Sequence, residues 1–430
     1  MNRHPLPTSS LQQSLPGSDD ITRVILDNGI VLLGRANFNS PSVVISGYLS
    51  AGSLFDPDEK LGLANFVASA LMRGTEKYDF QQIYDALESV GASLGFNAST
   101  HTAGFSGRSL AEDLLLLLDL LAESVRQPAF PADQVEKLRA QLLTGLAIRA
   151  QDTAEMASLA FDQIVFAGHP YSRPEDGWPE TVKAIHRNDL ADFHQHFFGP
   201  RGMVIAIVGA VEPKQAVEQV QRVLGDWQNP AQPKDPGLPP LNRLEKMTTR
   251  HITIPGKSQS DIVIGASGPK RRDPEYMAAS LGNSVLGQFG LMGRIGDVVR
   301  EQSGLAYYAS SSLSAGIGPG TWEVSAGVNP SNVRKASDLV IQELRRFVEQ
   351  GVTPEELSDS QANFVGRLPL SLESNAGVAS ALLSIERYDL GMDYYRQYPD
   401  LVWAVTPEKV LEAARKFIDP ERLAIVTAGL

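Results

Sequence analysis

Arg300 and Tyr307 are the two side chains of this chain whose types and spacing best suit chemistry on a peptide bond. They lie seven residues apart in the segment REQSGLAY. A guanidinium offers a planar fork of donors to a carbonyl or carboxylate, and a phenol can donate a hydrogen bond to an oxyanion that forms on a scissile carbonyl. The structural alternative is that Arg300 pairs with Asp297, one helical turn earlier, and that Tyr307 packs within a sheet.

A second informative segment, residues 62–75 with the sequence GLANFVASALMRGT, resembles a zinc helix that has lost its ligands. The likeness is to the inverted motif H-x-x-E-H of the pitrilysin, insulinase and mitochondrial processing peptidase superfamily. In that frame Asn65 replaces the first His, Ala68 the Glu and Ser69 the second His. The frame itself is kept at Gly62, Ala64, Phe66, Leu71, Gly74 and Thr75.

The missing side chains remove the metal chemistry, because catalytic zinc needs three convergent ligands, an open position for water and a base for that water. The resemblance also implies a third ligand, a Glu, on a later helix. The family's spacing from Ser69 leads to residues 141–148, QLLTGLAI, and no carboxylate occurs between Glu136 and Asp152. We therefore expect no cofactor in this chain, and zinc only in a partner.

The second half of the chain keeps a different signature of the same superfamily. Residues 284–310 resemble its glycine-rich turn, its helix with R-E and its G-L-A-Y strand start. The resemblance implies that Arg300 and Tyr307 act in trans on a substrate at a partner's zinc, with Arg300 also binding the substrate. It further implies that Gly287, Gly290 and Gly293 allow close approach of backbone near the peptide.

These resemblances imply a non-catalytic subunit of a heterodimeric zinc metallopeptidase, inactive alone. Its partners would be a homologous H-x-x-E-H subunit and an extended peptide that adds a strand to a sheet edge. Two alternatives stay open. One is a structural subunit like the core proteins of respiratory complex III, and the other is a peptide-binding chaperone without hydrolysis.

Composition limits the remaining classes of function. The net charge of −12 argues against a nucleic-acid surface, and the absence of cysteine excludes disulfides and thiol catalysis. The longest apolar stretch, residues 114–121, is too short to span a bilayer. With no apolar segment of signal length in the first twenty residues, we expect a cytoplasmic protein with no membrane contact.

The elements that must position these residues occur twice along the chain. In each half an apolar strand is followed by helices, by two alternating strands and by further helices, and the half closes on an apolar strand that ends in glycine. Residues 203–209 and 423–429 are these closing strands. Strands and helices in runs predict an α+β fold with two similar domains, each an antiparallel sheet covered by helices. The superfamily resemblance adds a clam-like arrangement.

The expected domain boundaries follow from composition. Residues 1–20 are polar and rich in Pro and Ser, which predicts a disordered tail. Residues 21–227 form the first expected domain, with the degenerate zinc motif. Residues 228–247 are Pro-dense and are expected to be a linker. Residues 248–430 form the second, with the Arg/Tyr signature.

Overall fold

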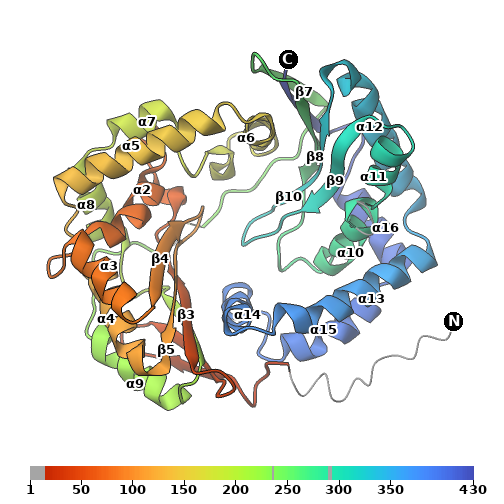
Figure 1. Cartoon of the computed structure of the whole chain (residues 1–430). Helices are drawn as coiled ribbons and strands as arrows, with labels where there is room; N and C mark the ends of the chain where they lie inside the picture. The colour runs from red at the N-terminus through yellow and green to blue at the C-terminus, as the bar shows by residue number, and fades with distance from the viewer. Residues whose placement is uncertain (1–14, 235–236, 289–292) are drawn as a thin grey trace. The chain divides into compact units, whose positions relative to one another are not determined.

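The computed structural model describes residues 15–234, 237–288 and 293–430, which form two compact units (Figure 1). Unit 1 consists of the described residues up to 146 together with 174–234 and 368–396. Unit 2 consists of residues 147–173 and 397–430, together with the described residues of 237–367. Each unit thus includes a segment from the half of the chain that mainly forms the other unit.

The strands of unit 1 are β1 (Thr22–Ile25), β2 (Val31–Ala36), β3 (Ser42–Leu49), β4 (Ser93–Ala98), β5 (Ala103–Leu110) and β6 (Val204–Gly209). The strands of unit 2 are β7 (Thr248–Thr253), β8 (Ser260–Ser267), β9 (Ala306–Leu313), β10 (Thr321–Val328) and β11 (Ala424–Gly429).

The helices up to residue 224 are α2 (Leu63–Ala70), α3 (Phe80–Ser89), α4 (Leu114–Arg126), α5 (Ala132–Arg149), α6 (Thr153–Val165), α7 (Pro179–Ala184), α8 (Arg187–Phe197) and α9 (Pro213–Leu224). The later helices are α10 (Tyr276–Gly287), α11 (Gly293–Gly296), α12 (Val333–Gln350), α13 (Pro354–Ser371), α14 (Asn375–Tyr388), α15 (Tyr394–Trp403) and α16 (Pro407–Phe417).

The sheet of unit 1 has the strand order β1-β2-β6-β3-β5-β4, and β2 and β6 form its parallel pair. Alternate residues of β3, such as Val43, Ile45 and Leu49, enter a core that also contains the apolar faces of α2, α4 and α8. Figure 1 shows α3 and α4 on this side of the sheet. This core fixes α2, the helix with the degenerate zinc motif.

The opposite face of the same sheet is covered by α14, from the C-terminal third of the chain. The guanidinium of Arg387 lies 5.4 Å from the ring centroid of Tyr48 on β3. At the edge of the sheet, Arg23 makes two hydrogen bonds of 2.8 Å with the carboxylate of Glu386. The first sheet is therefore a three-layer structure whose third layer is supplied late in the sequence.

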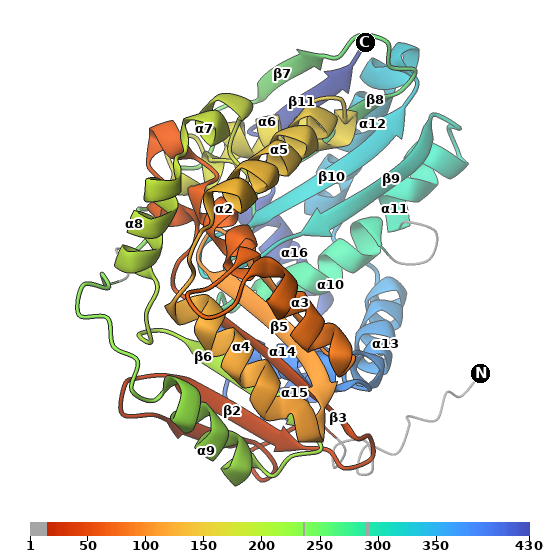
Figure 2. The ribbon, with the colours of Figure 1, turned by 60° about the vertical axis from the view of Figure 1, so that its left-hand side comes forward.

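The sheet of unit 2 has the order β7-β11-β8-β10-β9, with β7 and β11 parallel and the other pairs antiparallel (Figure 2). One face packs on α10, α12 and α16 around Trp322 and Phe347. The other face packs, at β8 and β11, on α6 through Phe161 and Val165. Helix α6 thus plays in unit 2 the part that α14 plays in unit 1. Strand β9, which contains Tyr307, is an edge strand.

The expected α+β class is confirmed, with one parallel pair in each otherwise antiparallel sheet. The expected strands and helices around the candidate residues are also confirmed, including the strands that end at Gly209 and Gly429. Helices lie on both faces of each sheet, because α14 and α6 are added to the expected layer. None of the helices in residues 15–234, 237–288 and 293–430 has the length and apolar character of a membrane span.

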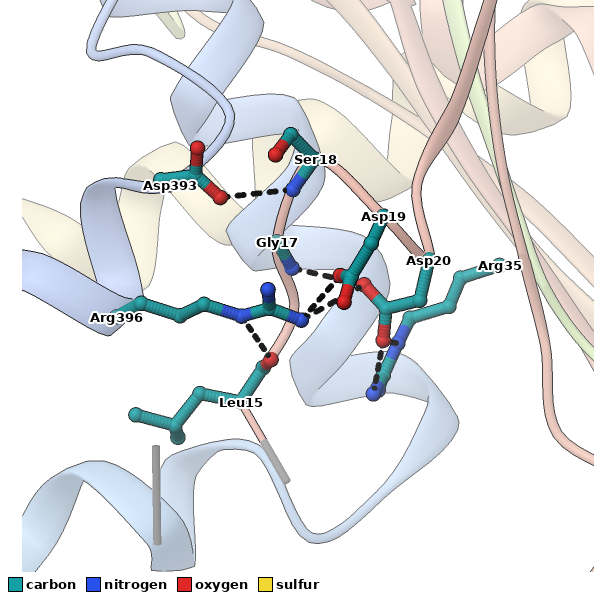
Figure 3. Close-up of polar contacts among 8 residues, drawn as sticks. All are labelled: Leu15, Gly17, Ser18, Asp19, Asp20, Arg35, Asp393 and Arg396. Atoms are coloured by element: carbon teal, nitrogen blue, oxygen red, sulfur yellow. Dashed lines mark hydrogen bonds and ion pairs between the residues drawn. The ribbon is translucent and has the colours of Figure 1, made fainter. Parts of the chain in front are cut away.

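The segment before β1 corrects one expectation. The predicted disordered tail, residues 1–20, does not extend over residues 15–20, which are held in unit 1 (Figure 3). Arg396 donates to the carbonyl of Leu15 at 3.0 Å and also pairs with Asp19, while Asp393 accepts from the amide of Ser18 at 2.8 Å. Leu15 is buried, so an apolar anchor accompanies the polar contacts. Pro and Ser content alone did not reveal these partners.

Candidate functional site

The three degenerate positions lie on helix α2, and none of them has a side chain suited to bind zinc. Ala68 is fully buried in the core of unit 1, whereas Asn65 and Ser69 are half-buried and lie one turn apart on one face. The Asn65 amide donates to the carboxylate of Asp176 at 3.0 Å. A methyl, a hydroxyl and an amide already engaged with a carboxylate do not fit zinc.

The frame around these positions is kept for reasons of backbone geometry. Gly62 has φ of 94°, and a Cβ at this position would lie 2.7 Å from the carbonyl oxygen of Asp176. The buried carboxylate of Asp56 accepts from the amides of Gly62 and Ala64 at 2.8 and 2.9 Å, which satisfies the start of the helix. At the other end the Thr75 hydroxyl accepts from the amide of Tyr78 at 3.0 Å. The frame residues therefore build the fold independently of metal.

The second place where a ligand was expected, residues 141–148, lies on α5. Within unit 1, Gln141 accepts from Arg73 at 2.8 Å, and Arg139 lies 5.3 Å from the ring centroid of Phe66 on α2. Two guanidinium groups thus lie in this region, Arg139 from α5 and Arg73 from the short helix η3 (Leu71–Arg73), while residues 141–148 of α5 contain no carboxylate. Over the ranges that the structure describes, no group of three His, Cys, Asp or Glu side chains could hold a metal ion.

Arg300 lies in the π-helical segment η6 (Asp297–Glu301), and its side chain is about one third exposed. The structural alternative, in which Arg300 pairs with Asp297, is wrong. The Nε of Arg300 lies 3.6 Å from the carboxylate of Glu301, while Asp297 accepts from the Gln302 amide at 2.6 Å. The wider turn of a π-helix changes which side chains face each other. A partly exposed pair of this kind leaves most of the guanidinium's donors available.

Tyr307 lies on a β-bulge in the edge strand β9. Val328 of β10 pairs with Ala306 and Gly327 pairs with Tyr308, so Tyr307 is the extra residue between them. Its side chain is 84% exposed, more than any other large apolar side chain in the described ranges. The structural alternative, a tyrosine packed within the sheet, is therefore wrong.

The turn between Arg300 and Tyr307 is tightly hydrogen-bonded. The amide of Gly304, which has φ of 61°, donates to the carbonyl of Arg300 at 2.9 Å, and the amide of Leu305 donates to that of Val299 at 3.1 Å. These bonds join the end of η6 to the start of β9. Arg300 and Tyr307 are consequently presented by one rigid segment of unit 2.

The three candidate glycines have different surroundings. Gly287 is buried at the end of α10, where a Cβ would lie 2.0 Å from the amide nitrogen of Ser311. Gly293 has φ of 63°, which favours glycine. Gly290 lies outside the described residues. The role of these glycines near a peptide stays a prediction.

The chain that follows Gly293 is anchored by a cluster of charged side chains that sequence reasoning missed. Arg294 makes hydrogen bonds of 2.7 and 2.5 Å with Glu356 on α13. Glu343 on α12 is nearly fully buried, with its carboxylate 3.8 Å from Arg294 and 3.5 Å from Arg346. Burial raises the pKa of Glu343. The cluster fixes the start of α11, which leads into η6 and Arg300.

Asp261 is a second missed residue. It stands at the start of the apolar strand β8, is 1% exposed, and accepts from the phenol of Tyr308 at 2.6 Å. Burial, and then this hydrogen bond, raise the pKa of Tyr308. An aspartate at the start of the sequence DIVIG is the only signal of this residue in the sequence, and that signal does not identify its partner.

Two protein-family models match the chain in succession. The model described as "Insulinase (Peptidase family M16)" matches residues 33–174, and that described as "Peptidase M16 inactive domain" matches residues 184–364. Both the degenerate helix and the Arg/Tyr segment fall within matched ranges.

Similar proteins and structures cover most of the chain. An uncharacterized zinc protease of Streptomyces coelicolor is 25% identical over 95% of this chain and 89% of its own length. Mouse mitochondrial cytochrome b-c1 complex subunit 1 is 26% identical over 66% of this chain and 58% of its own length.

Among solved structures, a peptidase M16 inactive domain from Pseudomonas fluorescens is 27% identical and covers 95% of this chain and 98% of its own, with a TM-score of 0.86. A protease from Helicobacter pylori, 15% identical with a TM-score of 0.87, shares the fold. Two consecutive family models and a fold shared over nearly the whole chain lead to one conclusion: the chain belongs to the peptidase M16 family.

Proposed function

We propose that this chain is the metal-free subunit of a heterodimeric M16 zinc peptidase. A homologous H-x-x-E-H partner would supply the zinc and the activated water. This chain would supply Arg300 and Tyr307 to the peptide at that site. The observation that carries the proposal is that one chain combines two features. Helix α2 has no zinc-binding side chains, and Tyr307 is 84% exposed on a bulge.

The exposure of Tyr307 supports the proposal because its hydroxyl has no hydrogen-bond partner among the residues that the structure describes and can donate to a bound ligand. Tyr307 follows η6 closely in the chain, so the Arg300 guanidinium belongs to the same segment. The guanidinium suits a substrate carbonyl or carboxylate. Preorganised donors of this kind stabilise charge that develops in a transition state.

The decisive experiment is reconstitution. The chain is purified without a His tag, alone and together with a zinc-bearing M16 chain of the same organism, and cleavage of a quenched-fluorescent peptide library is measured. We expect no hydrolysis by this chain alone, a 1:1 complex on size-exclusion chromatography, and activity in the mixture above that of the partner alone. Two independent species with no gain in activity would overturn the proposal.

A structural subunit is the second candidate, and the similarity to cytochrome b-c1 complex subunit 1 favours it. In that case a stable complex with other proteins would form, and Tyr307→Phe would change nothing in it. A peptide-binding chaperone would instead bind peptides without cleaving them, with or without a partner. A cytoplasmic location stays a prediction from the sequence.

A further inference from the structure

Asp261 is a buried carboxylate whose partners within the described chain are three neutral side chains. It accepts from the Tyr308 phenol at 2.6 Å, from the Gln259 amide at 3.1 Å and from the Thr153 hydroxyl, all within unit 2. Burial of a carboxylate without a cation is costly, and only several good hydrogen bonds offset the cost. Asp261 lies beside the bulge that contains Tyr307, so its hydrogen bonds act on the conformation of β9 at this point.

The position of the bulge is not determined by strand pairing alone. Two tyrosines follow each other in β9, and either of them could be the extra residue opposite Gly327 and Val328. In the observed register Tyr308 pairs with Gly327 and Tyr307 is left out. If the bulge lay one residue later in β9, Tyr307 would pair with Gly327 and Tyr308 would be the extra residue.

Contacts on the face of the sheet that contains Asp261 favour Tyr307, and not Tyr308, as the extra residue. Asp261 pairs with Gly327 across β8 and β10, and Gly327 pairs with Tyr308 across β10 and β9. A Cβ at residue 327 would lie 2.5 Å from the Tyr308 ring, so the glycine lets this ring lie flat on the sheet and reach Asp261. The tyrosine that pairs with Gly327 is thus the one whose phenol binds Asp261.

We propose that Asp261 is a positioning residue. Its hydrogen bond with Tyr308 holds that tyrosine on the sheet and thereby leaves Tyr307 as the bulged, exposed tyrosine. The consequence for catalysis rests on the proposed function of Tyr307, whereas the consequence for the register does not. Removal of the Tyr308 hydroxyl leaves Tyr307 as the adjacent phenol on β9 that can replace it as a donor to Asp261. The bulge then moves by one residue along β9, and Tyr307 becomes the buried tyrosine.

The register is tested on the purified chain by nitration with tetranitromethane, followed by peptide mapping. In the unchanged chain Tyr307 is nitrated and Tyr308 is protected. In Tyr308→Phe we expect nitration of Tyr307 to slow at least 10-fold, and in Asp261→Asn we expect Tyr308 to lose its protection. Glu323→Gln is the matched control, because Glu323 is a half-buried carboxyl group on β10 that pairs with Ser312, away from the bulge. Nitration of Tyr307 at the original rate in Tyr308→Phe would overturn the inference.

Activity of the reconstituted complex separates this inference from the proposed function. If both are right, Tyr308→Phe lowers kcat about as strongly as Tyr307→Phe, and the double variant loses no more than either alone. If Tyr307→Phe leaves kcat unchanged, the proposed function fails while nitration still decides the register. If only Tyr307→Phe lowers kcat and nitration of Tyr307 is unchanged in Tyr308→Phe, the positioning role of Asp261 is wrong and the proposed function stands.

Discussion

At the scale of single residues, the proposed function gives Arg300 and Tyr307 different tasks. Under that proposal Tyr307 would donate to an oxyanion, and this contact would strengthen only in the transition state. Tyr307→Phe in the reconstituted complex should therefore lower kcat by about 10²-fold and leave KM nearly unchanged. Steady-state kinetics on one peptide decide this. Tyr84→Phe, at an exposed tyrosine of α3, is the control and should behave as the unchanged complex does. A full kcat in Tyr307→Phe would remove the oxyanion role.

Arg300 should affect binding rather than turnover. If its guanidinium holds the substrate backbone before and during the reaction, Arg300→Ala raises KM about 10-fold or more with little change in kcat. Arg345→Ala, which breaks an exposed ion pair with Glu421 in the same unit, is the matched control and should leave KM unchanged. A fall in kcat alone would instead place Arg300 in the transition state.

The degenerate metal positions give a prediction that needs no partner. Plasma emission analysis of the purified chain should find no stoichiometric zinc. The triple variant Asn65→His, Ala68→Glu, Ser69→His should bind zinc weakly at most, because residues 141–148 supply no third ligand and Arg73 and Arg139 bring positive charge. One zinc ion per unchanged chain would contradict the account of α2.

At the scale of elements, the start of α2 depends on one buried carboxylate. Asp56→Ala leaves the amides of Gly62 and Ala64 without their acceptor, which should lower the free energy of unfolding by about 2 kcal/mol or more. Urea denaturation followed by circular dichroism measures the loss. Glu59→Gln changes an exposed carboxylate nearby and should shift stability by less than about 0.5 kcal/mol. Equal stability of the two variants would show that the cap is dispensable.

The docking of α8 on the end of α4 should make stability depend on pH. Nε2 of His194 donates to the carbonyl of Val125 at 2.8 Å, and burial lowers the pKa of His194 to about 4. Between about pH 6.5 and 4 the unfolded chain therefore binds a proton that the folded chain does not. The unfolding free energy falls as the pH falls through this window, by up to about 3 kcal/mol from this group.

The test compares urea midpoints at pH 7 and pH 4.5. His194→Gln keeps a donor to Val125 without a titrating group and should lose less stability on acidification than the unchanged chain. His196→Gln, at the exposed neighbouring histidine, should keep the full pH dependence. Identical slopes in all three proteins would assign the acid sensitivity to other groups.

The sequence predicted the elements well and their partners poorly. Periodicity predicted the closing strands at residues 203–209 and 423–429, because local patterns reflect local burial, and the family resemblance predicted the helix that contains Asn65. Periodicity could not predict the bulge at Tyr307 or the hydrogen bond between Tyr308 and Asp261, because both depend on residues of other strands. The π-helical turn that separates Arg300 from Asp297 was missed for a similar reason, since its hydrogen bonds leave no mark in composition.

At the scale of the whole molecule, the units are not sequential halves. A fragment of residues 1–236 lacks α14, so the face of β3 that contains Tyr48 loses its cover. We expect this fragment to bind a hydrophobic dye and to unfold without a cooperative transition. The same fragment joined to residues 368–396 through a Gly/Ser linker should recover a cooperative transition. A cooperative, dye-free fragment 1–236 would show that α14 is not needed.

The position of α14 late in the sequence also affects folding during translation. A ribosome adds roughly 5–20 residues per second, so the first sheet waits on the order of ten seconds or more between the synthesis of β6 and that of α14. During this time the face of β3 that contains Tyr48 stays without its cover in the nascent chain. Codon choice or arrest sequences between residues 210 and 368 would lengthen that exposure, and nascent-chain aggregation would rise with it.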